Sequence, residues 1–149
     1  MIHFSRNTHI YRPLKQVFAF VASPENDFQW QYGTFNSVQI SEGETGLGTL
    51  FRTVGHFMGR RIESICEVTE FELNQRYGFK SCSGPVDVVT LYTFEALQSG
   101  TKLMITIQVN PGDLFKVENI AAEKKVKKQY GENLALLKSV LETNRVVHP

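Results

Sequence analysis

The sequence of 149 residues has no long hydrophobic run and no secretory signal at its start. No stretch reaches the roughly 18 uninterrupted apolar residues that a membrane-spanning helix needs, so we expect no stable membrane insertion. The segment from Met1 to Arg6 lacks the charged region followed by an apolar core that marks a signal peptide. The expected location is therefore cytoplasmic.

Cysteine is scarce, and charge of one sign is not in excess. Cys66 and Cys82 are too few for a disulfide scaffold and lack metal-finger spacing. Sixteen Lys and Arg against fifteen Asp and Glu give a net charge of +1, which does not favour a strongly basic nucleic-acid binder. The histidines show no metal-ligand spacing, and no HExxH, P-loop, serine elbow or dinucleotide fingerprint is present. We predict no metal, no cofactor and no nucleic-acid partner.

What is present is the composition of an ordinary globular protein, with 42% hydrophobic and 11% aromatic residues. The alternation over residues 2–11 predicts a strand. Pro13 can open a helix, which Pro24 ends, and a second short helical segment then carries Phe28 and Trp30. The helical spacing before Pro24 is carried by Leu14, Val17, Phe18 and Val21.

From residue 35 to residue 110 the pattern is typical of β-structure, with turn signals at regular spacing. Six consecutive strands with short connections indicate an antiparallel meander. The expected strands cover residues 35–40, 49–57, 60–71, 76–83, 86–96 and 101–110.

A long helix is expected over residues 113–143, with Asp113 as its N-cap. Its second half has an apolar stripe, and Gly131 inside it marks either a bend or the close approach of another backbone. The lysines within 124–128 spread around the helix beside glutamates, which favours a solvated outer face over a binding patch. The stripe consists of Tyr130, Leu134, Leu137 and Leu141.

Several short stretches, in this order, resemble the START-like (SRPBCC) superfamily, which includes polyketide cyclase/dehydrase-like proteins. The matching stretches are Ile10–Val21, Ser23–Trp30, Gly46–Thr49, Val68–Glu72, Phe94–Glu95 with Gly100–Leu103, and Leu134–Glu142. The resemblance implies an α+β helix-grip fold, in which a seven-stranded curved antiparallel sheet and two short helices surround a long C-terminal helix. Residues 1–149 would then form a single ligand-binding domain with an internal cavity.

Alternation within the strands predicts which side chains face that cavity. The inner face is expected to be apolar and aromatic with scattered hydroxyl groups, which suits a bulky, mostly hydrophobic ligand. Trp30, Tyr32 and Phe35 either line the cavity mouth or pack in the core. The predicted ligand-binding residues are Trp30, Phe35, Arg52, His56, Ser64, Cys66, Tyr77, Phe79, Thr90, Tyr92, Ile105 and Leu134.

The strand over residues 49–57 has two possible orientations. If Arg52 and His56 face inward, Arg52 can clamp an anion and His56 can act as a general acid or base. In the other orientation Phe51 and Phe57 face inward and both ionisable side chains lie in water, which is the commoner arrangement because arginine is seldom buried without a partner.

Cys66 and Cys82 lie on neighbouring strands of one predicted hairpin. Pairing Val68 with Phe79 and Glu70 with Tyr77 places Cys66 opposite Ser81 and turns Cys82 to the other face. A disulfide is then excluded by geometry, and we predict free thiols.

The leading hypothesis is a carrier or sensor that binds a small hydrophobic or amphipathic molecule in an internal cavity, without catalysis. The alternative is a polyketide cyclase/dehydrase-like enzyme acting in the same cavity, with His56 or Tyr92 as general acid or base and Arg52 as the clamp. A third possibility is an interaction module, so the expected oligomeric state is a monomer or a homodimer.

Overall fold

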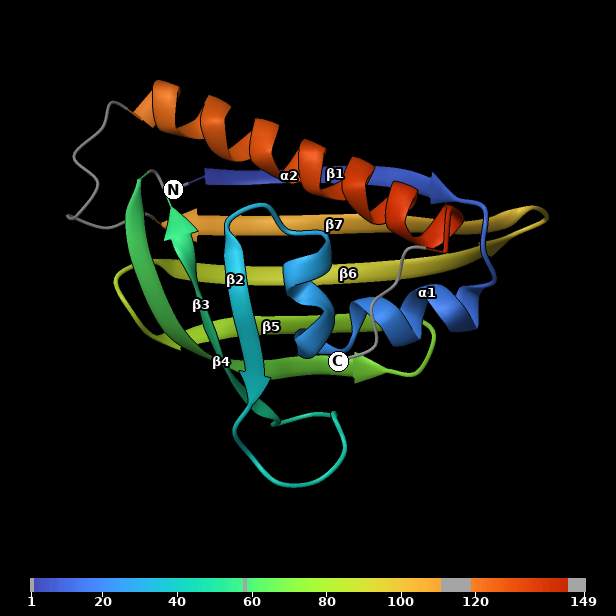
Figure 1. Cartoon of the computed structure of the whole chain (residues 1–149), viewed down its shortest axis with the longest axis horizontal. Helices are drawn as coiled ribbons and strands as arrows, with labels where there is room; N and C mark the ends of the chain where they lie inside the picture. Colours follow the sequence, from blue (N-terminus) through green and yellow to red (C-terminus); the bar gives the residue numbers. More distant parts are fainter. Residues whose placement is uncertain (1, 58, 111–118, 145–149) are drawn as a thin grey trace.

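The computed structural model describes residues 2–57, 59–110 and 119–144 (Figure 1). Each expected strand agrees with the structure to within one residue at either end. The Asp113 N-cap prediction falls outside the described residues. The elements are β1 (Ile2–Ile10), α1 (Leu14–Val21), the 3₁₀ helix η1 (Pro24–Gln29), β2 (Thr34–Gln39), β3 (Leu50–Phe57), β4 (Arg60–Glu72), β5 (Arg76–Ser83), β6 (Asp87–Leu97), β7 (Gly100–Asn110) and α2 (Asn119–Glu142).

Within the described residues, seven strands form one antiparallel sheet in the order β1-β7-β6-β5-β4-β3-β2. The strands β2 to β7 are neighbours in chain order, as a meander requires, and β1 pairs with β7 at the far edge. Figure 1 shows that the sheet curves, with α2 lying across one end of its concave face and α1 and η1 in front of it. This is the helix-grip arrangement that the sequence predicted.

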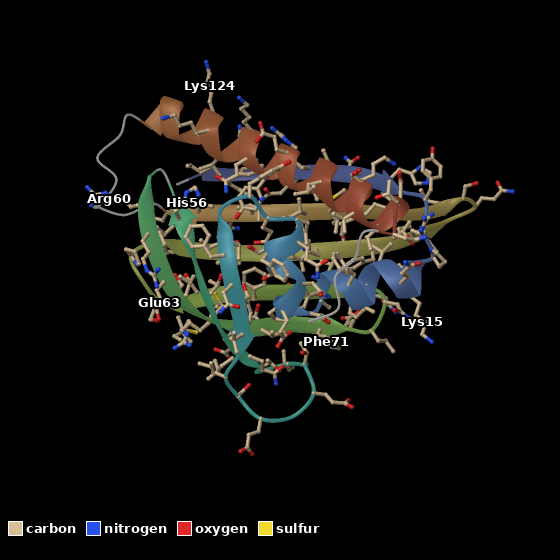
Figure 2. All side chains as sticks on the ribbon, in the orientation of Figure 1. Lys15, His56, Arg60, Glu63, Phe71 and Lys124 are labelled. Atoms are coloured by element: carbon tan, nitrogen blue, oxygen red, sulfur yellow. The ribbon has the colours of Figure 1, made fainter. Side chains whose placement is uncertain are left out.

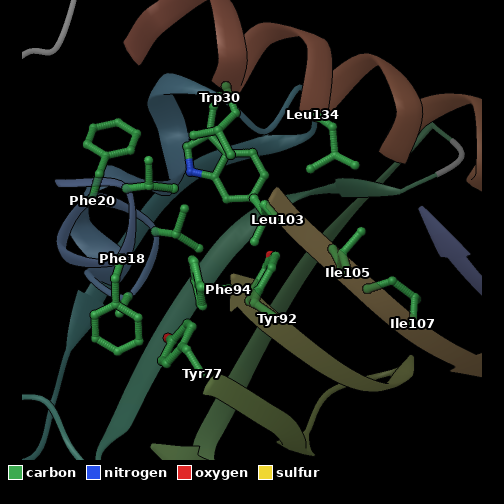
Figure 3. Close-up of a cluster of buried hydrophobic side chains, with 14 of the residues drawn as sticks. Phe18, Phe20, Trp30, Tyr77, Tyr92, Phe94, Leu103, Ile105, Ile107 and Leu134 are labelled. Carbon is green, nitrogen blue, oxygen red and sulfur yellow. The ribbon is translucent and has the colours of Figure 1, made fainter. Parts of the chain in front are cut away.

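The inner face of the sheet and the helices share one hydrophobic core. Leu103, Ile105, Ile107 and Val109 of β7 are all buried, because every second side chain of a strand points to the same side. Trp30 packs edge-on against Tyr92 with ring centroids 6.1 Å apart, and Leu134 reaches the same cluster from α2 (Figure 3). The predicted inward orientation of six ligand-binding candidates on β4 to β7 agrees with their burial, namely Ser64, Cys66, Tyr77, Thr90, Tyr92 and Ile105.

The first two helices follow from the spacing of their buried residues. In α1 the side chains of Val17, Phe18 and Val21 are buried. The second segment is a 3₁₀ helix, in which residues three apart lie one above another. Pro24, Asp27 and Trp30 have this spacing, and all of them are buried.

The helix α2 buries the predicted stripe at Leu134, Leu137 and Leu141, whereas Tyr130 is half-buried. A Cβ atom added at Gly131 would meet nothing within 4 Å, so the predicted close approach of another backbone is wrong. No helix in the described ranges is long and apolar enough to cross a membrane.

The prediction that both cysteines are free thiols is confirmed, although part of the predicted pairing between β4 and β5 is wrong. Cys66 pairs with Ser81 and Val68 with Phe79, and both cysteines are free. Glu70, however, pairs with Gly78 instead of Tyr77, because an irregularity after Val68 shifts the register. An extra residue in one strand of a pair has this effect.

Candidate ligand-binding cavity

A cavity of about 160 Å³, partly open to the surface, lies among the inner face of the sheet, η1 and α2. Small side chains on the inner face of β3, β4 and β5 leave this space unfilled. The lining residues are Asp27, Gln31, Gly33, Thr34, Phe51, Thr53, Gly55, His56, Ile62, Ser64, Cys66, Phe79, Ser81, Val86, Val88, Thr90, Tyr92, Val109, Gln129, Tyr130 and Asn133.

One part of the wall is aromatic. The rings of Phe51 and Phe79 meet edge-on with centroids 5.2 Å apart, and Tyr92 lies 6.5 Å from Phe79. A cavity of roughly 150 Å³ lined by apolar side chains can hold benzene. The enclosed space therefore suits a single ring or a short chain, which corrects the expectation of a bulky ligand.

A row of hydroxyl groups crosses three strands, and two members of it belong to the cavity wall. Ser37 of β2 pairs with Thr53 of β3, and Thr53 pairs with Ser64 of β4. Ser37 Oγ lies 3.1 Å from Thr53 Oγ1, within hydrogen-bond distance. Thr53 and Ser64 line the cavity and offer donors and acceptors beside the rings, whereas Ser37 is buried next to Thr53 without lining the cavity.

Asp27 adds a carboxyl group at the end of this row, where its side chain is hydrogen-bonded to Ser37. Only 8% of Asp27 is exposed, and it lines the cavity. Burial raises the pKa of Asp27 well above its ordinary value, the Ser37 hydrogen bond opposes this, and Glu25 adds to the rise.

Sequence analysis missed Asp27. The three-residue spacing to Pro24 and Trp30 would have indicated it if a 3₁₀ helix had been predicted there.

Three other titratable groups of the wall, Cys66, Tyr92 and Tyr130, remain neutral at physiological pH. Burial raises the pKa of Cys66 to about 12 and that of Tyr130 to about 12. Burial also raises the pKa of Tyr92, and the nearby Asp27 carboxyl adds to the rise. These groups can donate hydrogen bonds, but they are poor nucleophiles and bases.

The mouth of the cavity depends on the close approach of β2 to β3. The His56 amide donates a hydrogen bond to the Gly33 carbonyl over 2.7 Å. A Cβ atom at Gly55 would lie 2.0 Å from that same carbonyl oxygen, so only glycine fits there. An outer groove, which shares Gln31, Thr34, His56 and Gln129 with the cavity, continues from the mouth and is also lined by Phe28, Tyr32, Phe35, Lys125, Lys128 and Glu132.

The structure brings some of the predicted site residues together and separates others. The predicted residues that line the cavity are His56, Ser64, Cys66, Phe79, Thr90 and Tyr92. Four others belong to the buried core without lining it, namely Trp30, Tyr77, Ile105 and Leu134. Phe35 lies at an irregularity of β2 and is exposed in the outer groove, 5.5 Å from the His56 ring.

The inward orientation of Arg52 is wrong. Phe51 is only 1% exposed, which places Arg52, the next residue along the strand, on the outer face. Arg52 Nε lies 3.8 Å from Glu63 Oε1, and both side chains are about half exposed. Figure 2 shows Glu63 pointing away from the interior, so Arg52 has no access to the cavity, whereas His56 is exposed at its mouth.

The lysines of α2 fit the predicted solvated face. Lys124 is exposed and points away from the sheet (Figure 2). Lys127 pairs with Glu123 over 3.3 Å, and Lys128 lies 3.9 Å from Glu132. Exposed pairs of this kind contribute little to stability.

The fold and the cavity define a START-like helix-grip protein with an internal space between sheet and helices. A family model described as "Polyketide cyclase / dehydrase and lipid transport" matches residues 1–142, and the chain belongs to this family. The comparison with curated proteins found no match.

Solved structures share this fold at low sequence identity. TTHA0849 from Thermus thermophilus has a TM-score of 0.74 and 20% identity, covering 95% of this chain and 94% of its own. A START superfamily protein from Mycobacterium smegmatis has a TM-score of 0.72 and 19% identity, and the match covers 97% of this chain and 96% of that protein's chain. DR_A0006 from Deinococcus radiodurans has a TM-score of 0.72 and 12% identity, and the match covers 97% of this chain and 99% of that protein's chain.

Proposed function

We propose that this protein binds a small, mostly apolar molecule in the cavity and acts as a carrier or sensor of it. The observation that carries the proposal is a partly open space of about 160 Å³, with aromatic rings and hydroxyl groups side by side in its wall. Removing an apolar ring from water supplies the affinity, and the polar row orients the molecule. The family description, which includes lipid transport, supports the same class of ligand.

A pair of variants on neighbouring residues of β6 tests this proposal. Val88 lines the cavity, whereas Val89 is 47% exposed on the opposite face. We expect Val88→Trp to fill the cavity and to weaken the binding of benzyl alcohol by at least about tenfold, since the ring loses its buried contacts. Val89→Trp is the control and should bind like the unmodified protein in a calorimetric titration. Equal binding by both variants would place the ligand outside the cavity.

A second candidate function is cyclase- or dehydrase-like catalysis, as the family description allows. Arg52 is excluded as a clamp by its outward position, so the observation that favours this function is the Asp27 carboxyl in the same wall as Tyr92. Burial keeps Asp27 protonated to higher pH, as a general acid requires.

Loss of water from a small β-hydroxyketone, followed by the absorbance of the enone product, tests this second function. Asp27→Asn should lower the rate by at least about 100-fold if Asp27 is the acid. An unchanged rate in Asp27→Asn would show that Asp27 is not the acid, and no turnover by the unmodified protein would contradict the catalytic function as a whole.

A further inference from the structure

The cavity wall contains the carboxyl group of Asp27 but neither a lysine nor an arginine side chain among the described residues. Asp27 takes part in none of the ion pairs among these residues. Lys125 and Lys128 line only the outer groove, where Glu132 accompanies them. In the described part of the chain the buried wall therefore carries the Asp27 carboxyl without a lysine or arginine, and the basic His56 lies at the exposed mouth.

The neighbours of Asp27 cannot supply this positive charge. Its hydrogen-bond partner is the Ser37 hydroxyl, and the groups that interact with it electrostatically are Glu25, Cys66, Tyr77 and Tyr92. All of these groups are neutral or negative. A carboxylate or phosphate of a ligand would enter a wall in which, among the described residues, no lysine or arginine is present and the basic His56 lies only at the exposed mouth, and a buried anion is strongly unfavourable unless it is paired.

The aromatic part of the wall favours the opposite charge. The rings of Phe51, Phe79, Tyr92 and Tyr130 line the same cavity as Asp27. Aromatic faces attract cations, and an ammonium group next to Asp27 favours the ionised form of this buried carboxyl, so that the two groups can pair. The volume of about 160 Å³ limits the guest to one ring or a short chain.

We propose that the cavity selects a small amphipathic amine, whose ammonium group pairs with Asp27 and whose apolar part lies against the aromatic wall. This inference rests on the proposed binding function and adds the chemical class of the ligand. It distinguishes this cavity from one that holds an anionic lipid or a fatty acid.

Three probes of nearly the same size test the proposal: benzylamine, benzyl alcohol and benzoate. Each is titrated into the full chain and followed by NMR chemical shifts. We expect benzylamine to bind about tenfold more tightly than benzyl alcohol, because a hydrogen bond to a charged group adds that much, and benzoate to bind most weakly.

The variant Asp27→Asn keeps the shape of the side chain and removes its charge. It should weaken benzylamine binding by about tenfold and change benzyl alcohol binding by less than about threefold. Glu25→Gln is the matched control, because it removes a carboxylate from the same helix at a position that does not line the cavity, and it should keep the preference for the amine.

Two kinds of failure are distinguishable. If benzyl alcohol binds but benzylamine binds no more tightly, or if Asp27→Asn leaves the preference for benzylamine unchanged, the proposed amine selectivity is overturned and the binding function remains. If none of the three probes binds, the proposed binding function fails together with the inference.

Discussion

Asp27 connects the pH dependence of stability with the chemistry of the cavity, because it is a buried carboxyl in the cavity wall. A carboxyl group with 8% exposure and no cation beside it in the described part of the chain is unfavourable when ionised. Its pKa is therefore raised in the folded state, with burial as the largest cause. In the unfolded chain the same group has a pKa of about 3.9.

The pH dependence of stability follows from this difference. Between the unfolded and the folded pKa the native state holds one proton more, so Asp27 lowers the stability progressively as the pH rises through this interval. Asp27→Asn removes the effect. We expect the variant to melt a few degrees above the unmodified protein at pH 8 and at the same temperature near pH 3.5, by differential scanning calorimetry. A variant that melts lower at pH 8 would show that the carboxylate is stabilised in the fold.

The two cysteines make a second residue-scale prediction. Cys82 is exposed, whereas Cys66 is buried in the cavity wall with its pKa raised to about 12. Because the thiolate is the reactive form, iodoacetamide should label Cys82 in the native protein and label Cys66 only after unfolding. Peptide mapping by mass spectrometry gives the result for each thiol, and equal labelling of both in the native protein would contradict the burial of Cys66.

At the scale of elements, β3 shows what alternation decides and what it leaves open. The pattern correctly places Phe51 and Arg52 on opposite faces, but it does not say which face is inner, because both faces of this strand carry apolar side chains. The structure shows that the face with Phe51 is the inner one, because Phe51 is buried and its ring packs edge-on against Phe79. The side chain of Phe57 lies outside what the structure describes, so Phe51 alone carries this conclusion.

The consequence for β3 is measurable by chemical denaturation. Phe51→Ala should lower the free energy of unfolding by about 3–5 kcal/mol, as for other large buried rings. Arg52→Ala should change it by less than about 1 kcal/mol, because its pair with Glu63 is exposed. Similar losses for both variants would mean that Arg52 is not a surface residue.

Other elements could be predicted in part. Strand positions followed from turn signals and alternation, since each strand is bounded by turn-forming residues. The irregularities near Phe35 and after Val68 could not be predicted, because no local pattern marked the extra residue. The second helical segment was predicted, but its 3₁₀ pitch was not, and this is why Asp27 was overlooked.

At the scale of the whole molecule, the fold could be predicted but the size of the cavity could not. The scattered hydroxyl residues of the predicted inner face, such as Ser64, Ser81 and Thr90, indicated that the interior is not fully apolar. The free volume, however, depends on how far the sheet curves and how closely α2 and η1 approach it. Alternation within single strands contains no such distance.

The most direct test of the cavity as a binding site is an NMR measurement of contacts between bound benzyl alcohol and labelled methyl groups. We predict nuclear Overhauser effects from the ring of the ligand to methyl groups of Ile62, Val86 and Val88, which line the cavity. Effects that involve only exposed methyl groups, such as those of Val38 and Val89, would place the ligand on the surface and contradict the account.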